Sequence, residues 1–291
     1  MGRAARNGVR MASPRTTAYL FPGQGAQSAA ALGAARRDAP DLLACCVDLL
    51  GDEPFTRCDE STRFAQPAIL LASLAAWRRI APGGARAFAG HSLGELSALA
   101  AAGALSQIDA VRLAVIRGEE MARAGERGEP GSMLALLKGT PEAAAAVADA
   151  HGLAVANDNA PGQLVVSGPQ PGIDAARRGA REHGLRALEL NVAGAFHSPA
   201  MEPARAAYTR ALGTIEWRTP RFPVYSGLTA EPFTDPVREL SQAVVAPVRW
   251  REVMAALAGA GCERFVDVGP GDVLEKLVAR NVPQEGARAA A

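Results

Sequence analysis

The sequence lacks several features that would place it in a membrane or nucleic-acid-binding class. No run approaches 18 continuous apolar residues free of charge, so a transmembrane span is not expected. The net charge of +1 gives no general attraction for nucleic acid or anionic lipid. We therefore expect neither as a partner. The 291 residues, 48% of them hydrophobic, suffice for one large α/β domain that carries a smaller insertion.

Lysine and cysteine are also scarce. Only Lys138 and Lys276 are lysines among 31 basic residues, and this arginine-rich composition indicates codon bias more than a binding surface. The four cysteines form no C-x-x-C pair and show no metal spacing with histidine, so no metal site is expected. Cys45 and Cys46 lie in an apolar helical stretch and are expected to pack in the core. Reduced thiols favour a cytoplasmic location.

The two ends of the sequence have no pattern of a packed element. Residues 1–16 are basic but contain no apolar segment of the kind found in signal peptides, so a disordered leader is expected there. Residues 284–291 are expected to form a frayed tail.

One pentapeptide carries a chemical signal. Gly90-His91-Ser92-Leu93-Gly94 reads G-x-S-x-G, between a strand expected over 85–90 and a helix that follows directly. This strand–turn–helix context is the one a nucleophile elbow requires. The turn exposes the Ser92 hydroxyl, and the Leu93 N–H, at a helix N-terminus, is directed towards an oxyanion formed there. The motif alone leaves water and other acyl acceptors open.

A serine nucleophile needs a base, and the chain has only four histidines. His91 is next to the serine, and its side chain is expected to leave the elbow in another direction. His151 and His183 lie near the ends of expected helices, where solvated histidines are usual. His197 follows the inserted unit, where the chain returns to the main domain, and sites are common at such crossings. We expect His197 to be the base; a capping or packed histidine is the alternative.

The order of apolar segments predicts two units. Residues 131–197 read β-α-β-β-α-β, which indicates a ferredoxin-like small subdomain inserted into a large α/β subdomain of residues 17–130 and 198–283. Further expected elements are helices over 41–50, 66–80 (with Pro67 in its first turn), 107–124 (opened by Ser106 and stopped by Gly125), 199–212 and 250–260, and a strand over 264–269.

Seven motifs occur in the order seen in one enzyme family. They are FPGQGAQ (21–27), GHSLGE (90–95), RGEEM (117–121), NDNAPGQLVVSG (157–168), GAFHSPAM (194–201), APVRW (246–250) and DVGPGDVL (267–274). From about residue 17 to 280 the sequence resembles malonyl-CoA:acyl-carrier-protein transacylases, whose fold also serves as the acyltransferase domain of polyketide synthases. The resemblance implies a hydrolase-like parallel sheet with a nucleophile elbow and an inserted ferredoxin-like subdomain.

The resemblance also implies catalytic roles. Ser92 would accept the acyl group, His197 would act as general base and acid, and the backbone N–H groups of Gln24 and Leu93 would form the oxyanion hole. In the family a main-chain carbonyl near the PVRW segment orients the histidine. Arg249 stands where bacterial fatty-acid enzymes often have glutamine, and the G-M-G turn that usually follows GQGAQ is absent here.

Arg117 is the residue that indicates which substrate the protein binds. It shares a mainly apolar helical stripe with Leu113 and Met121, and from periodicity alone a solvated surface arginine is the alternative. The resemblance implies that its planar guanidinium pairs with the free carboxylate of a malonyl group. Met121 is expected to line the same pocket.

Two more residues are implied near the substrate. Phe196 resembles the Ala-Phe-His variant associated with malonyl units, with ordinary core packing as the alternative. Asn157, with Asn159, is expected in a loop that borders the site.

The expected reaction is a ping-pong transfer of malonyl from malonyl-CoA to the phosphopantetheine thiol of an acyl carrier protein, in fatty-acid or polyketide synthesis. No resident cofactor is implied, the carrier protein is a transient partner, and a monomer is expected. The alternatives are a polyketide acyltransferase for another extender unit, an editing acyl hydrolase and a non-catalytic docking module. Arg117 argues against the hydrolase, and intact Ser92, His197 and Gln24 argue against the docking module.

Overall fold

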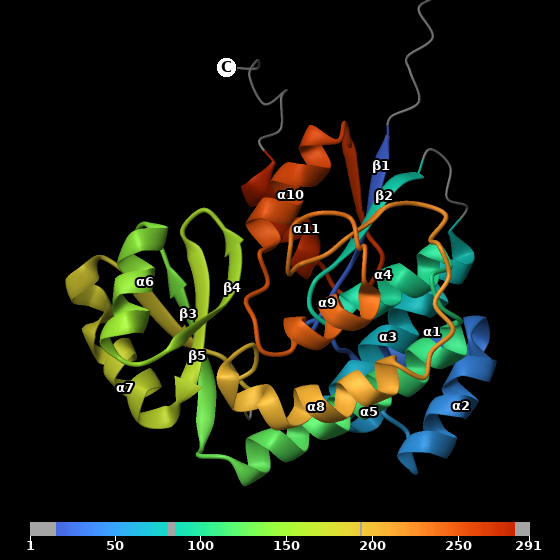
Figure 1. Ribbon diagram of the computed structural model, residues 1–291, viewed down its shortest axis with the longest axis horizontal. Coiled ribbons are helices and arrows are strands. Elements are labelled where there is room, and N and C mark those ends of the chain that lie inside the picture. Colours follow the sequence, from blue (N-terminus) through green and yellow to red (C-terminus); the bar gives the residue numbers. More distant parts are fainter. Residues whose placement is uncertain (1–15, 81–84, 193, 283–291) are drawn as a thin grey trace, which may run out of the picture.

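The computed structural model describes residues 16–80, 85–192 and 194–282. Nearly all of the leader expected over 1–16, and all of the tail expected over 284–291, lie outside these residues. The described part of the chain contains a parallel and an antiparallel four-stranded sheet, each covered by helices (Figure 1). The α/β fold class expected from the sequence is therefore confirmed.

The parallel sheet brings together the turns that follow its two central strands, and Ser92 lies in one of these turns. Its strands are β1 (Thr17–Phe21), β2 (Ala85–Gly90), β7 (Val224–Tyr225) and β8 (Arg264–Asp267), in the spatial order β7-β2-β1-β8. Since the carboxyl ends of parallel strands meet at one edge, the turns after β1 and β2 lie side by side. Gly23 and His91 are so close that a Cβ on Gly23 would lie 2.4 Å from the His91 carbonyl oxygen.

Side chains alternate along β1 between two apolar cores. Tyr19 and Phe21 point into the larger core, and Ala18 and Leu20 point into a smaller one. The smaller core is closed by α10 (Trp250–Gly259) and α11 (Val273–Asn281). The helices of the larger core are α1 (Leu32–Asp38), α2 (Pro40–Leu50), α3 (Thr62–Arg79), α4 (Gly94–Ala102), α5 (Gln107–Arg127), α8 (Glu202–Leu212) and α9 (Pro236–Ala243).

The antiparallel sheet has the strand order of a ferredoxin-like unit, β4-β5-β3-β6. Its strands are β3 (Gly131–Leu137), β4 (Ala154–Ala160), β5 (Gln163–Pro169) and β6 (Arg186–Glu189), and its helices are α6 (Pro141–Ala150) and α7 (Gln170–Gly179). One face, with Leu134 and Val166, packs under these helices. The other face, with Met133 and Val165, belongs to the larger core. The inserted unit therefore packs one face of its sheet against the larger core.

Two details of the expected helices were wrong. Ser61 caps α3 by accepting a hydrogen bond from the Arg63 N–H, so the helix begins at Thr62 and Pro67 lies in its second turn, not its first. Helix α5 opens at Ser106 as expected but continues through Gly125 and ends before Gly128. A single glycine costs a helix only about 1 kcal/mol relative to alanine, which the packing of α5 offsets.

Several short elements were not expected from the sequence. Helices α1, α9 and α11 have seven to nine residues, too few for a clear helical period. Short 3-10 helices occupy Ala29–Ala31, Phe55–Arg57, Ala180–His183 and Pro199–Met201. Within the described ranges, we find no helix that combines the length and the apolarity of a membrane span.

Strand β4 joins the antiparallel sheet to the segment that precedes α10 through one isolated parallel β-bridge, Asn157 to Val248. The Asp158 N–H donates to the Val248 carbonyl and the Val248 N–H donates to the Ala156 carbonyl, both at 2.9 Å. The Arg251 guanidinium, from α10, donates to the Asp158 carboxylate at 2.7 to 3.0 Å. The segment around Val248 is therefore held by the inserted unit although it follows α9 of the large one.

Candidate active site

The turn between β2 and α4 holds Ser92 in a left-handed conformation, with φ of +54°. The flanking glycines are required by close backbone contacts. A Cβ on Gly90 would lie 2.0 Å from the Gly94 carbonyl carbon, and a Cβ on Gly94 would lie 2.0 Å from the Phe21 carbonyl oxygen. The G-x-S-x-G pattern is thus a steric requirement of a sharp turn that exposes the serine hydroxyl.

The structure brings His197 to this hydroxyl. Its Nε2 lies 2.8 Å from Ser92 Oγ, and its Nδ1 lies 2.8 Å from the Ala243 carbonyl oxygen and 3.2 Å from that of Ala246. Because a carbonyl can only accept, Nδ1 must carry the ring proton, which leaves the Nε2 lone pair facing the serine. The orienting groups are therefore main-chain carbonyls, from α9 and the residue just before Pro247.

Burial, together with the nearby Arg117 charge, lowers the pKa of His197 to about 3, although the hydrogen bonds to the Ala243 and Ala246 carbonyls oppose this shift. The imidazole is therefore neutral at physiological pH and able to accept the serine proton. Among the described residues, none of the other three histidines forms a hydrogen bond to the Ser92 hydroxyl, although His91 lines the same cavity. His91 turns away and meets the Asn159 side chain at 2.8 Å, while His151 ends α6 and His183 lies in a 3-10 helix. Arg249 pairs with Glu252 and does not contact His197.

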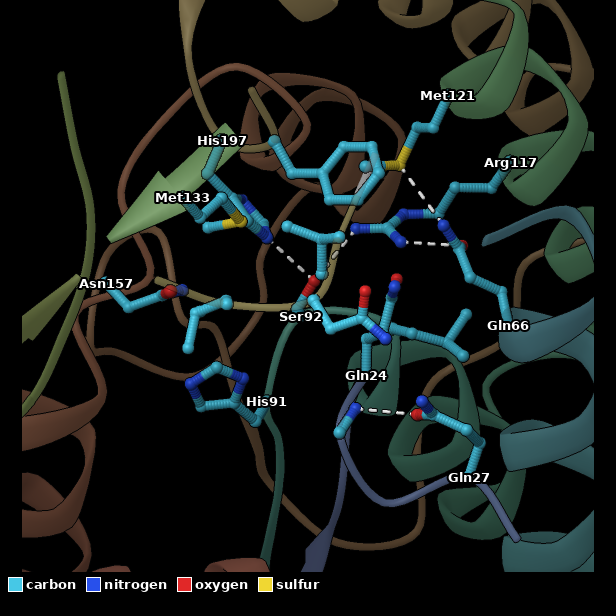
Figure 2. Close-up of a pocket in the computed structure, with 16 residues that line it drawn as sticks. Gln24, Gln27, Gln66, His91, Ser92, Arg117, Met121, Met133, Asn157 and His197 are labelled. Atoms are coloured by element: carbon cyan, nitrogen blue, oxygen red, sulfur yellow. Dashed lines mark hydrogen bonds between the residues drawn. The ribbon is translucent and has the colours of Figure 1, made fainter. Parts of the chain in front are cut away.

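Arg117 is a buried cation at the serine, not a surface side chain. Only 5% of the residue is exposed, and burial lowers the pKa of its guanidinium. Nη1 donates to Gln66 Oε1 at 2.7 Å and Nη2 donates to Ser92 Oγ at 3.1 Å (Figure 2). No carboxylate in the described residues forms an ion pair with it. A substrate carboxylate would supply the missing countercharge.

Gln66 and Thr62 extend this contact, and sequence reasoning missed both. Gln66 Nε2 donates to Thr62 Oγ1 at 2.9 Å and approaches Met121 Sδ at 3.3 Å. The Thr62 hydroxyl donates to Gln24 Oε1 at 2.9 Å. A glutamine within the apolar run of α3 was the available signal, because a polar residue on a buried helix face needs partners.

Two backbone N–H groups of residues that line the cavity have no hydrogen-bond acceptor within the described residues. Within the described part of the chain, neither the Gln24 nor the Leu93 N–H donates an internal hydrogen bond, and both residues line the same pocket as Ser92. Leu93 directly precedes α4, so its N–H also has the favourable field of a helix N-terminus. The pair has the properties of an oxyanion hole.

The remaining expected residues surround a cavity of about 320 Å³ over Ser92. Met121, Phe196 and Asn157 all line it, together with Met133 and residues 190–192 (Figure 2). Phe196 is 5% exposed and packs in the larger core as well. Asn157 lies within β4 and not in a loop, because that strand continues to Ala160.

A second buried ionisable group lies behind the site. Glu95, in the first turn of α4, accepts from the Gly227 N–H at 2.7 Å and is 2% exposed. Burial raises its pKa to about 8; the Gly227 hydrogen bond and the Arg117 charge oppose this, and Glu239 adds to it. For the residues described, no group of three or more His, Cys, Asp or Glu side chains is arranged to hold a metal ion.

Comparison with known proteins shows which family this chain resembles. Residues 47–291 match the family model of the acyl transferase domain. The malonyl CoA-acyl carrier protein transacylase of Bacillus subtilis is 37% identical, covering 90% of this chain and 89% of that protein. The polyketide biosynthesis protein ThaF of Burkholderia thailandensis is 38% identical over 94% of this chain, which spans only 25% of that protein's length.

Solved structures agree. The malonyl-CoA:acyl carrier protein transacylase of Xanthomonas oryzae superposes with a TM-score of 0.85 at 31% identity, covering 92% of both chains. A malonyl-transacylase solved in complex with its type II polyketide synthase acyl-carrier protein superposes at 0.82, also with 31% identity, over 92% of this chain and 93% of that one.

Proposed function

The chain belongs to the acyl transferase domain family, and from this we propose that it moves a malonyl group from malonyl-CoA to the phosphopantetheine thiol of an acyl carrier protein. The observation that carries the proposal is the buried Arg117 guanidinium, 3.1 Å from the nucleophilic hydroxyl and without an internal carboxylate partner among the described residues. A malonyl thioester placed at Ser92 would present its free carboxylate to this cation.

The first half-reaction loads the serine. His197 Nε2 takes the Ser92 proton as Oγ attacks the thioester carbonyl carbon, and the carbonyl oxygen becomes an oxyanion bound by the Gln24 and Leu93 N–H groups. When the intermediate collapses, the carbon–sulfur bond breaks and the coenzyme A sulfur receives the proton from His197. The products are free coenzyme A and a malonyl-Ser92 ester.

The second half-reaction unloads it. The pantetheine thiol of the carrier protein gives its proton to His197 and attacks the ester carbonyl, using the same oxyanion hole. The Ser92 oxygen leaves and regains a proton from the imidazolium. All bond changes are supplied by the serine, the histidine and the two thiols, so the proposed cycle needs no resident cofactor or metal.

Pocket and partners complete the proposal. Met121, Phe196 and Asn157 line the cavity that would hold the acyl group. The bulky ring of Phe196 would crowd a methyl branch on the second carbon of that group. The solved complex of a related transacylase with an acyl-carrier protein supports a transient carrier partner. A monomeric, cytoplasmic enzyme is part of the proposal, and the free thiols of all four cysteines fit it. Relatives named for fatty-acid-type transacylases and for polyketide biosynthesis support either pathway.

The deciding experiment is intact-mass analysis after brief incubation with malonyl-CoA. One malonyl group should add to the wild-type protein and none to Ser92→Ala, and a holo acyl carrier protein should then remove it. An adduct that survives Ser92→Ala, or no adduct at all, contradicts the mechanism. Release to water faster than to the carrier protein, over a panel of acyl-CoAs, would instead identify an editing hydrolase.

A further inference from the structure

We propose that Thr62 and Gln66 are positioning residues that join the carboxylate-binding end of the site to its oxyanion end. They form one hydrogen-bonded chain from Arg117 through Gln66 and Thr62 to Gln24. The inference rests on the proposed malonyl transfer and assigns part of its selectivity to two residues that do not touch the reacting atoms.

The chemistry of the groups gives the chain one direction. A guanidinium can only donate, so the Gln66 oxygen faces Arg117 and its amide nitrogen donates to Thr62 Oγ1. The Thr62 hydroxyl proton is then free to be donated to Gln24 Oε1, at 2.9 Å. Each member thus has its donor and acceptor sites matched to its neighbours, and no single link can reverse without breaking another.

Burial makes each link costly to lose. Gln66 is 1% exposed, and Thr62 and Arg117 are each 5% exposed, so water cannot readily replace a missing partner. An unpaired donor or acceptor at such a position bears its full desolvation penalty. The chain therefore restricts the guanidinium and the Gln24 loop to positions in which both ends are satisfied.

The backbone holds the chain's members at a set spacing. Thr62 and Gln66 lie one turn apart on α3, and Arg117 comes from α5. Gly118 allows these helices to approach closely, because a Cβ there would lie 2.9 Å from the Thr62 carbonyl oxygen. Gln24 lies in the loop after β1 and lines the same cavity as Ser92. Three separate elements thus converge on Thr62.

This arrangement affects malonyl more than acetyl substrates. The carboxylate of a malonyl group would engage Arg117 while Nη1 stays with Gln66, and its thioester oxygen would be held beside Gln24. An acetyl group uses only the oxyanion end. Loss of the chain should therefore reduce discrimination between the two substrates as well as rate.

Thr62→Val, which keeps shape but removes the hydroxyl, tests the inference. The measurements are kcat and KM for malonyl-CoA and acetyl-CoA in Ser92 acylation. We expect kcat/KM for malonyl-CoA to fall about tenfold more than that for acetyl-CoA, the effect of losing about one buried hydrogen bond. Thr62→Ser, which keeps the hydroxyl, should restore the wild-type ratio. In an Arg117→Ala background, Thr62→Val should no longer change the ratio.

Thr209→Val is the matched control, because it removes a threonine hydroxyl bonded to Arg205 and Ser241, away from the pocket. It should leave the malonyl-to-acetyl ratio unchanged. If Thr62→Val does not fold, Gln66→Met breaks the same chain at the next member and carries the same expectation. A folded variant with the wild-type ratio overturns the inference while leaving malonyl transfer intact, whereas failure of wild-type malonylation overturns the proposed function itself.

Discussion

The Arg117 guanidinium donates to the hydroxyl oxygen of Ser92 at 3.1 Å, so the cation and the nucleophile are in direct contact. The same oxygen lies 2.8 Å from His197 Nε2. A buried positive charge at this place favours a negatively charged substrate group, favours the serine oxygen as it loses its proton and disfavours protonation of the histidine. In the proposed reaction, one arginine would therefore act on substrate selectivity and on the basicity of His197 together.

Arg117→Ala should lower kcat/KM for malonyl-CoA by at least 100-fold, because loss of a charge-assisted pair in a buried site costs several kcal/mol. Acetyl-CoA should acylate Ser92 at least as well as in wild type, since no unpaired cation remains. Mass analysis of the acyl-enzyme with each substrate measures both. Arg112→Ala, on the exposed face of the same helix, is the control, and unchanged selectivity in Arg117→Ala would remove Arg117 from its assigned role.

The acid limb of Ser92 malonylation should lie well below the ordinary histidine range. Because burial and Arg117 hold the pKa of His197 near 3, the base stays neutral from pH 5 to 8, and the single-turnover rate should change little between these values. Rapid-quench measurement at several pH values tests this. The exposed His183, changed to Gln, should leave the profile as it is, and an inflection at pH 6.5 in the wild type would contradict the assignment.

Glu95→Gln should stabilise the protein increasingly as pH rises. The folded-state pKa of Glu95 is about 8, above its ordinary 4.5, so between these values the folded protein holds a proton that the unfolded chain releases. Wild-type stability from this group is thus lost with rising pH, by about 1.4 kcal/mol per pH unit inside the window. Glutamine can still accept from the Gly227 N–H and does not titrate.

Urea unfolding of both proteins at pH 5, 7 and 8.5 measures the difference. Glu142→Gln, at an exposed position on α6, should show no such trend over this range. A stability difference between Glu95→Gln and wild type that stays constant with pH would show that Glu95 is ionised in the folded protein.

Gly94→Ala should abolish malonylation and lower the thermal midpoint, since its Cβ would lie 2.0 Å from the Phe21 carbonyl oxygen. Gly33→Ala is the matched control. It lies in α1 with nothing within 4 Å of the added Cβ, and alanine should stabilise that helix by about 1 kcal/mol. Thermal unfolding and the mass assay test both, and an active Gly94→Ala enzyme would contradict the steric account of the elbow.

Local chemistry made part of the site predictable. The elbow shows in the sequence because two glycines and a serine satisfy a tight turn at neighbouring positions. His197 was reached because only four histidines were available. Arg117 was placed on an apolar helix stripe by its spacing, although its carboxylate-binding role came from family resemblance alone.

The residues that sequence reasoning missed depend on contacts between distant segments. The hydrogen bonds of Thr62 and Gln66 form where α3, α5 and the loop after β1 come together. No local sequence pattern predicts that these three segments are in contact. The Ala243 and Ala246 carbonyls belong to residues whose side chains carry no chemical signal. Pro67 was assigned to the wrong turn because the cap at Ser61 precedes the apolar period.

The backbone ladder between β4 and Val248 has a mechanical consequence for catalysis. Val248 lies two residues after Ala246, whose carbonyl faces the ring proton of His197, so a small shift of β4 changes the electrostatic field at the catalytic base. If the proposed carrier protein docks on the antiparallel sheet and displaces β4, it would act on the proton-transfer step. A change in docking would then alter the turnover rate, even where the affinity for the carrier protein stays the same.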